Sequence, residues 1–109
     1  MERSSEFRIV LVTCGSTKEA RKIAKAVVTK RLAACVNIVG GSIESIYWWK
    51  GKLESARERL LIMKTGARRV KELEQEVLKL HSYETPEILV IRVERALKAY
   101  GAWIRNTVI

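Results

Sequence analysis

The chain has 109 residues, of which 48% are hydrophobic and 30% are charged. This length allows one domain with its own core, and the composition excludes disordered, fibrous and disulfide-scaffold proteins. The 21 lysines and arginines outnumber the 12 acidic residues, giving a formal net charge of +9, so nucleic acid or another acidic surface has to be considered as a partner.

Residues 1–6 are polar and lack the apolar core of a signal peptide, and no apolar run approaches the roughly 18 residues of a membrane span. We therefore expect these residues to be flexible and the protein to be cytoplasmic, with no membrane partner. Cys14 and Cys35 lie in apolar runs without metal-binding spacing. This pattern predicts buried free thiols in a reducing compartment, with a disulfide or a metal site as the alternatives.

The first half of the chain predicts a strand, a helix and two further extended segments. Residues 7–14 are an almost unbroken apolar and β-branched run, typical of a central strand. A helix capped by Ser16 or Thr17 follows Gly15, and its apolar stripe has helical spacing: Ala20, Ile23, Ala24, Val27 and Val28. Two extended segments come next, over residues 32–39 and 42–49, separated by two glycines.

The second half predicts a long hairpin, a second helix, a last strand and a terminal helix. Lys50-Gly51 marks a tight turn, which joins the preceding segment to a strand over residues 53–65. A helix over 66–80, a strand over 88–91 and a helix over 96–107 complete the chain. This order predicts an α+β fold of ferredoxin-like βαββαβ type with a C-terminal helix, forming one domain over residues 1–109.

The densest polar segment is residues 81–87, which holds the only histidine and the only proline of the chain. Imidazole suits copper and zinc, so His81 and Glu84 are candidate ligands for Cu(II) or another divalent cation. The alternative is structural: His81 ends a helix, and Pro86 fixes the entry to the next strand. No nucleophile motif, phosphate-binding glycine loop or paired zinc-ligand spacing occurs, so we expect no enzyme activity and no obligatory cofactor.

Aromatic residues and lysines lie close together around the predicted turn, in the sequence Tyr47-Trp48-Trp49-Lys50-Gly51-Lys52. Such a segment could stack nucleobases. However, Tyr47 and Trp49 should point to one face of the hairpin and Trp48 to the other. Both faces being bulky favours packing against another subunit. The first helix is also basic, with six lysines and arginines against Glu19 over residues 18–31, and this is either a solvated face or a phosphate-binding one.

Taken together, these segments make the chain resemble the CutA family of divalent-cation tolerance proteins over residues 7–104. The segments that carry the resemblance are Val12-Thr13-Cys14, residues 31–38, residues 45–52, Met63-Lys64-Thr65, residues 81–87 and Trp103-Ile104. The resemblance implies a ferredoxin-like subunit in a homotrimer similar to PII-type signalling proteins, with long strands that reach neighbouring subunits. It further implies a role in tolerance of divalent metals, for which copper binding has been proposed.

The resemblance also implies a site. His81 and Glu84 would bind the metal, and an inter-subunit ligand cleft would be lined by Tyr47, Trp48, Trp49, Lys64, Tyr83 and Pro86. Val12 and Leu80 stand where some members have a cysteine and a second histidine. We predict a trimeric sensor or buffer that responds to metal or a small ligand. The alternatives are a basic nucleic-acid-binding module, disfavoured because the aromatic signature of RNA-binding domains is missing, and a structural adaptor for a partner protein.

Overall fold

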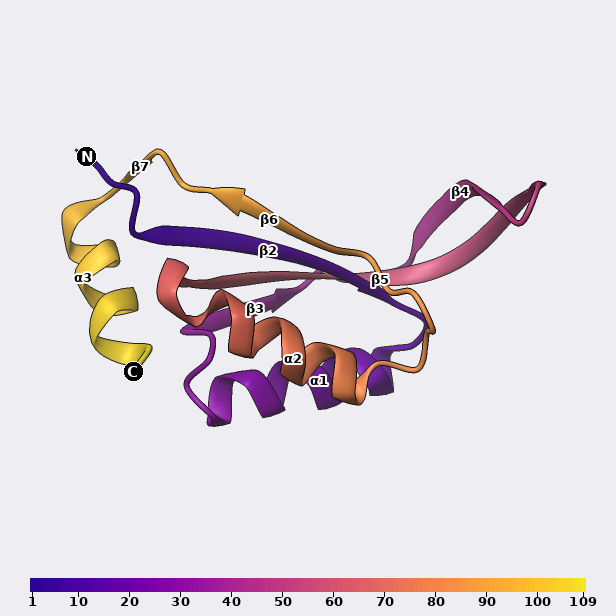
Figure 1. The fold of residues 1–109 in the computed structure, drawn as a ribbon, viewed down its shortest axis with the longest axis horizontal. Helices are drawn as coiled ribbons and strands as arrows, with labels where there is room; N and C mark the ends of the chain where they lie inside the picture. Colours follow the sequence, from indigo (N-terminus) through magenta and orange to yellow (C-terminus); the bar gives the residue numbers. More distant parts are fainter.

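The fold is built around the central strand β2 (Phe7–Cys14) of an antiparallel sheet (Figure 1). The computed structural model describes residues 1–109, apart from the side chain of Glu2. On one side β2 pairs with β5 (Lys52–Gly66), and on the other with β6 (Ile88–Arg92). The short strand β3 (Cys35–Ile38) pairs with the inner half of β5, and β4 (Ile43–Trp49) pairs with its outer half.

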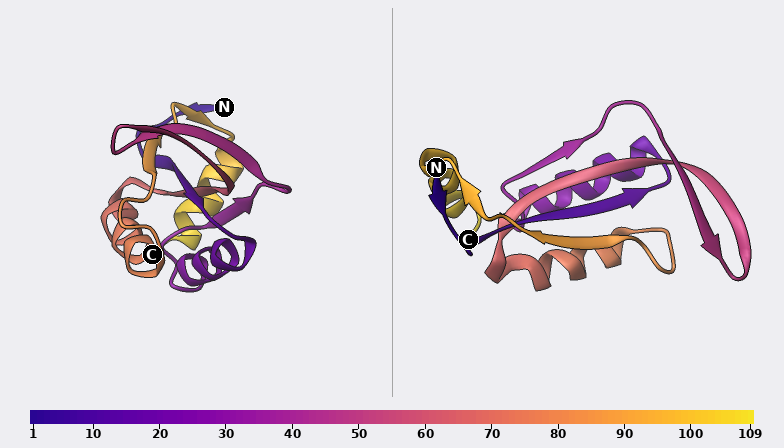
Figure 2. Two further views of the ribbon diagram at one scale, coloured as in Figure 1. Left: turned by 90° about the vertical axis from the view of Figure 1, so that its right-hand side faces the viewer. Right: turned by 90° about the horizontal axis from the view of Figure 1, so that it is seen from above.

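Two helices cover one face of this sheet, as the views in Figures 1 and 2 show. They are α1 (Thr17–Thr29) and α2 (Val70–Leu80), the second preceded by the 3₁₀ turn η1 (Ala67–Arg69). Their apolar stripes meet the inward side chains of β2 and β5 in one core, whose fully buried members include Val10, Val12, Ile23, Val27, Leu61, Met63, Leu73 and Val77. The structure thus confirms a mixed α/β fold with an antiparallel sheet.

The third helix, α3 (Lys98–Thr107), covers only one end of the other sheet face, around Phe7. The helix approaches closely because residue 101 is glycine: a Cβ there would lie 2.9 Å from Cε2 of Phe7. The rest of this face is apolar: Ile9, Leu11, Leu60 and Ile62 are partly buried there, and Leu89 and Ile91 of β6 are exposed. We call this surface the open sheet face.

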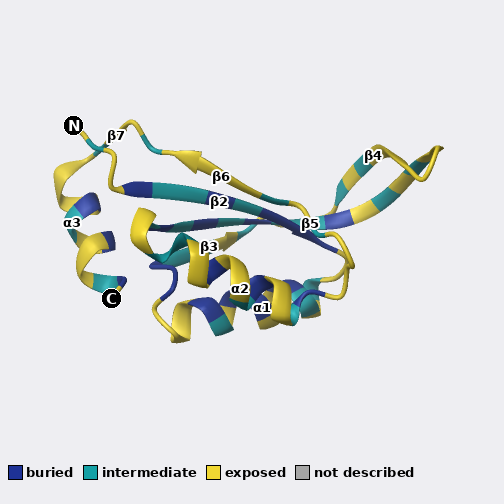
Figure 3. Ribbon diagram, viewed as in Figure 1, coloured by how far each residue is buried: buried dark blue, intermediate teal, exposed yellow. Residues whose placement is uncertain are grey.

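The predicted hairpin exists and extends beyond the rest of the molecule (Figure 2). The whole chain, including the hairpin, measures 44 × 25 × 25 Å. It turns at Lys50 and Gly51, whose φ angles of 50° and 78° match the right-handed twist of the flanking strands. Figure 3 shows that its outer part and β6 are largely exposed. On one face of the hairpin lie Ile46, Trp48 and Leu53, which are 67%, 73% and 64% exposed.

Two features differ from the sequence predictions. The predicted strand over residues 32–39 is wrong at its start, because Leu32 and Ala33 donate their N–H groups to the carbonyl of Val27 in the last turn of α1, and β3 begins only at Cys35. Residues 1–6, for which flexibility was predicted, make contacts: β1 (Glu2–Arg3) pairs with β7 (Arg95–Ala96). The pairing is only two residues long and carries no periodic signal. Mobility of these residues stays a prediction.

Candidate functional site

The candidate site lies where the outer end of β2, the end of α2 and the middle of β5 meet, around His81. This residue follows the last residue of α2, and its backbone N–H still donates to Val77. The side chain is buried against β2, with Nε2 lying 2.7 Å from the carbonyl oxygen of Thr13. Nδ1 accepts the backbone N–H of Tyr83 at 3.1 Å, so the ring proton lies on Nε2 and is donated to Thr13. Both ring nitrogens are therefore engaged.

Tyr83 continues this network to the hairpin. Its hydroxyl donates to Oε2 of Glu58 at 3.0 Å, and Glu58 is a carboxylate of β5 that is only 7% exposed. Burial, together with the Glu58 carboxylate, raises the pKa of Tyr83 to about 12, so the phenol stays a proton donor at neutral pH. We call the path from Thr13 through His81 and Tyr83 to Glu58 the Thr13–Glu58 hydrogen-bond chain.

Residues 81–83, in the loop after α2, are also hydrogen-bonded to α1. Oε1 of Glu19 accepts the backbone N–H of Ser82 at 2.6 Å, and Oε2 accepts its hydroxyl at 3.1 Å. Nearby, Nε of Arg59 donates to the Thr17 hydroxyl at 2.8 Å. Residues 81–83 are therefore held by β2, β5 and α1, so displacing this loop disturbs all three elements.

Sequence reasoning missed Thr13, Glu19 and Glu58 as parts of this site. Glu58 offers a signal in retrospect, because strand alternation puts it on the hairpin face of Tyr47 and Trp49, just before the apolar run 60–63. Thr13 and Glu19 carry no such signal, because their roles depend on how α1 and α2 pack against the sheet.

The two predicted metal ligands do not form a ready-made site within one chain. Glu84 is exposed, whereas His81 has no free ring nitrogen. Among the described residues, no group of three or more His, Cys, Asp or Glu side chains is placed to hold a metal ion. A closed transition-metal site usually needs three or four ligands. Cation binding by His81 and Glu84 therefore stays a prediction.

The predicted cleft residues fall into separate regions of the single chain. Tyr47 and Trp49 lie half-exposed on the hairpin face that leads to Glu58, whereas Trp48 lies on the opposite face. Tyr83 and Pro86 belong to the loop after α2. Lys64 lies six residues along β5 from Glu58, about 20 Å of extended strand, and its Nζ is 3.9 Å from Sγ of Cys35. A cleft that contains all of them would need a second subunit, and it stays a prediction.

Both cysteines are free thiols, as predicted. Cys14 is fully buried, but Cys35 is half-buried on the sheet face opposite α1 and α2, which corrects the prediction that both are buried. Burial raises the pKa of Cys14 to about 11, and the neighbouring Glu19 carboxylate adds to this effect.

We predict that folding protects Cys14 from alkylation. In a Cys35→Ser variant at pH 8, Cys14 should react with iodoacetamide at least tenfold more slowly in the folded than in the denatured chain, because the thiolate is the nucleophile and a thiol with a pKa near 11 is almost fully protonated at this pH. Mass spectrometry of timed samples measures the rates, and denaturation in guanidinium provides the control. Equal rates in both states would contradict the buried placement of Cys14.

The sequence comparisons agree with one another. A family model described as CutA1 divalent ion tolerance protein matches residues 8–107. The divalent-cation tolerance protein CutA of Archaeoglobus fulgidus is 46% identical over 99 residues, which cover 91% of this chain and 95% of that protein. Protein CutA of Homo sapiens is 46% identical over 95 residues, 87% of this chain, and the match spans only 52% of the human protein.

The structural comparisons agree with the sequence matches. A structure of the periplasmic divalent cation tolerance protein CutA from Archaeoglobus fulgidus superposes with a TM-score of 0.91 at 44% identity, covering 94% of this chain and 99% of that one. The divalent cation tolerance protein of Thermus thermophilus gives a TM-score of 0.90 at 40% identity, covering 93% and 97%.

The prediction of a cytoplasmic protein is wrong by this comparison, because the Archaeoglobus protein is described as periplasmic. That prediction rested on polar N-terminal residues and unpaired cysteines, and neither feature distinguishes one aqueous compartment from another. None of the described helices is both long and apolar enough to cross a membrane.

Proposed function

Because the chain belongs to the CutA1 divalent ion tolerance protein family, we propose that it is a non-enzymatic homotrimer that responds to divalent cations through the loop after α2. In this proposal the subunit is ferredoxin-like and the assembly is similar to PII-type signalling proteins. The observation that carries the proposal is the Thr13–Glu58 hydrogen-bond chain, which links the candidate cation ligands to the hairpin.

The response begins at Nδ1 of His81. Its lone pair is occupied by the N–H of Tyr83, and the other ring nitrogen carries the proton given to Thr13. A Cu(II) or Zn(II) ion that binds this imidazole must therefore displace the Tyr83 N–H. Glu84 is exposed one residue further along and supplies a carboxylate to the same ion. Binding of the cation and movement of Tyr83 are thus one event.

Movement of Tyr83 reaches the hairpin through its hydroxyl. Loss of the 3.0 Å bond to Glu58 leaves a buried carboxylate without that donor, which costs about 1–3 kcal/mol or more for a charged group. Glu58 lies directly opposite Ile43, where β4 begins. The base of the hairpin must then rearrange, which makes the protein a cation-dependent switch rather than a passive store.

Assembly as a trimer would complete the site. One chain offers only His81 and Glu84, fewer ligands than a closed transition-metal site requires, so further donors would come from a neighbouring subunit. The exposed apolar side chains of the hairpin and of the open sheet face support such an assembly, since apolar surfaces of this kind mark interaction sites.

The proposal is tested by calorimetric titration of the metal-free protein with Cu(II) and with Zn(II), while tryptophan fluorescence is followed; two of the three tryptophans lie in the hairpin. We expect the wild-type protein to bind at least one metal with a change in fluorescence. His81→Ala should bind it at least tenfold more weakly. Tyr83→Phe keeps the backbone N–H and lacks the hydroxyl, so it should still bind the metal but lose most of the fluorescence change.

Two outcomes contradict the proposal in different ways. If neither metal binds, or if His81→Ala binds as tightly as the wild type, His81 is not a cation ligand. If Tyr83→Phe retains the full fluorescence change, the cation is bound but the signal does not pass through the bond between Tyr83 and Glu58.

A further inference from the structure

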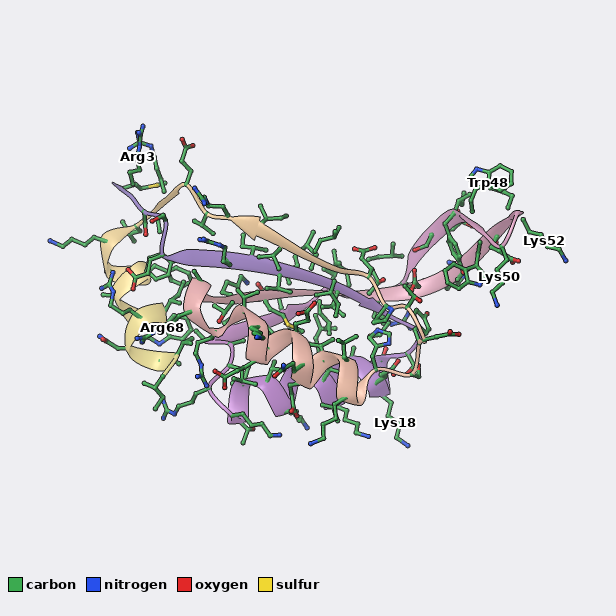
Figure 4. All side chains as sticks on the ribbon, in the orientation of Figure 1. Arg3, Lys18, Trp48, Lys50, Lys52 and Arg68 are labelled. Carbon is green, nitrogen blue, oxygen red and sulfur yellow. The ribbon has the colours of Figure 1, made fainter. Side chains whose placement is uncertain are left out.

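Four arginines gather at the end of the molecule that lies opposite the hairpin. They are Arg3 and Arg95, from the β1–β7 pair, and Arg8 and Arg92, from β2 and β6. A groove of about 620 Å³ opens beside two of them and is lined by Arg3, Ser4, Ser5, Arg92 and Glu94. We call it the arginine groove. Figure 4 shows Arg3 at this end, far from Trp48 and Lys50 at the hairpin tip.

The strand register places these arginines in two like-charged pairs. Arg3 lies directly opposite Arg95, and Arg8 lies directly opposite Arg92. Like charges in directly opposed positions destabilise a strand pair. Among the described side chains, no carboxylate forms an ion pair with Arg3, Arg92 or Arg95. The fold thus concentrates positive charge here, and the groove lining holds a single acidic residue, Glu94.

The backbone around the groove is held in place by hydrogen bonds. Ser4 donates its N–H to the carbonyl of Glu94 at 2.9 Å, and Val93 donates to Phe7 at 3.2 Å. The Arg8 guanidinium donates to the carbonyls of Ser5 and Phe7 at 2.7 and 2.9 Å. The side chain of Arg8 therefore stabilises the backbone beside the groove, whereas the side chains of Arg3 and Arg92 remain available to a ligand.

A second, smaller depression lies next to the groove, and one of its cations is already paired. It measures about 190 Å³ and shares Arg3 and Ser4 with the groove. Arg105, which lines this depression together with Arg3, binds both carboxylate oxygens of Glu6 at 2.8 and 2.9 Å, and this interaction holds the pKa of Glu6 below its usual value. Arg105 is therefore paired, whereas Arg3 and Arg92 form no ion pair with a described carboxylate.

We propose that the arginine groove binds a small soluble anion with two or more phosphate groups. Guanidinium groups recognise phosphate in a bidentate manner, and the hydroxyls of Ser4 and Ser5 add donors. The volume lies within the usual range for ligand sites. No aromatic or aliphatic side chain lines the groove, so phosphate rather than a nucleobase is the recognised group. The inference is independent of His81 and of the trimer.

A nucleic-acid strand fits this end less well than a small anion does. A polymer needs a continuous track of cations, whereas Arg3 and Arg92 line one local depression. Lys18, at the start of α1, lies well away from Arg3 in Figure 4. The charge is instead focused on one depression.

The test is calorimetric titration of the metal-free protein with inorganic pyrophosphate and with orthophosphate. We expect pyrophosphate to bind, and more tightly than orthophosphate. The double variant Arg3→Gln/Arg92→Gln should bind at least tenfold more weakly. The matched control, Arg21→Gln/Lys22→Gln on the exposed face of α1, removes the same charge elsewhere and should bind within twofold of the wild type.

Glu94→Gln should change the pyrophosphate affinity in the opposite direction to the arginine substitutions. It removes the only acidic side chain of the groove lining and should strengthen pyrophosphate binding severalfold, and a weaker affinity would contradict an anion site. Absence of binding to the wild type, or equal losses in the two double variants, would overturn the proposal.

A lipid headgroup could offer the same phosphate chemistry. Co-sedimentation with phosphatidylcholine vesicles that contain phosphatidic acid distinguishes the two sources. Binding to vesicles through Arg3 and Arg92 without binding of soluble pyrophosphate would overturn the small-anion proposal. His81→Ala should bind pyrophosphate like the wild type, so failure of the cation proposal leaves this one intact.

Discussion

Replacing Trp48 and Leu53 with lysine is expected to dissociate the proposed trimer into single chains. The two residues are cross-strand partners near the hairpin tip, and both are highly exposed in the single chain. Their replacement therefore costs the isolated fold little. In an assembly that covers them, the change removes the burial of two large apolar side chains, each contributing about 1.5–3 kcal/mol, and introduces two desolvated ammonium groups. The loss occurs at every copy of the interface.

Sedimentation equilibrium measures the outcome directly. The wild type should have three times the chain mass of 12.4 kDa, and the double variant should have the mass of one chain. Leu78→Lys is the matched control, since it exchanges an exposed leucine of α2 for lysine outside the hairpin; it should leave the mass unchanged. A wild-type mass of one chain, or a double variant that remains trimeric, would contradict the assembly through the hairpin.

Leu61→Ala is expected to lower the free energy of unfolding by about 3 kcal/mol, within the range of about 2–5 kcal/mol for leucine-to-alanine changes in cores. Leu61 is fully buried in β5, directly opposite Val12 in β2 and Ile38 in β3. It therefore fills the space between three strands and the helices. A loss of this size is a large part of the stability of a small domain, about 5–15 kcal/mol in total.

Urea unfolding in the Trp48→Lys/Leu53→Lys background is the suitable measurement, because the stability of an obligate oligomer depends on its concentration. Leu78→Ala, at a side chain that is 49% exposed, should change the stability by less than about 1 kcal/mol. Similar losses at residues 61 and 78 would show that burial in this core is not what determines the cost.

Much of the fold could be predicted because its main elements carry strong local signals. The stripe from Ala20 to Val28 has helical spacing, and the turn at Lys50-Gly51 sits between two extended segments. The start of β3 was predicted wrongly because Leu32 looks like a strand residue, and only the packing at the end of α1 shows that it bonds back to Val27.

The candidate site could be predicted only in part. His81 and Tyr83 lie in a conspicuous polar segment, but their partners Thr13 and Glu58 come from distant strands. The sequence around Thr13 and Glu58 contains no pattern that would predict their contacts with His81 and Tyr83. The opposition of Arg8 and Arg92 is hidden in the same way, since it depends on strand register, and a shift by one residue would send the side chains to opposite faces.

Strand β5 pairs with three other strands, and these pairs should form in a definite order during folding. The hairpin closes across a two-residue turn, a local event that takes about 1–10 μs in isolated hairpins. Pairing of β5 with β2 must join Phe7 to Gly66, and such long loops close late because their entropy is lost before the contacts form. A newly made chain should therefore display Trp48 and Leu53 on a finished hairpin before its own sheet exists. Chains that meet at that stage can bind one another too early, so crowded synthesis is the condition under which this protein is most exposed to misassembly.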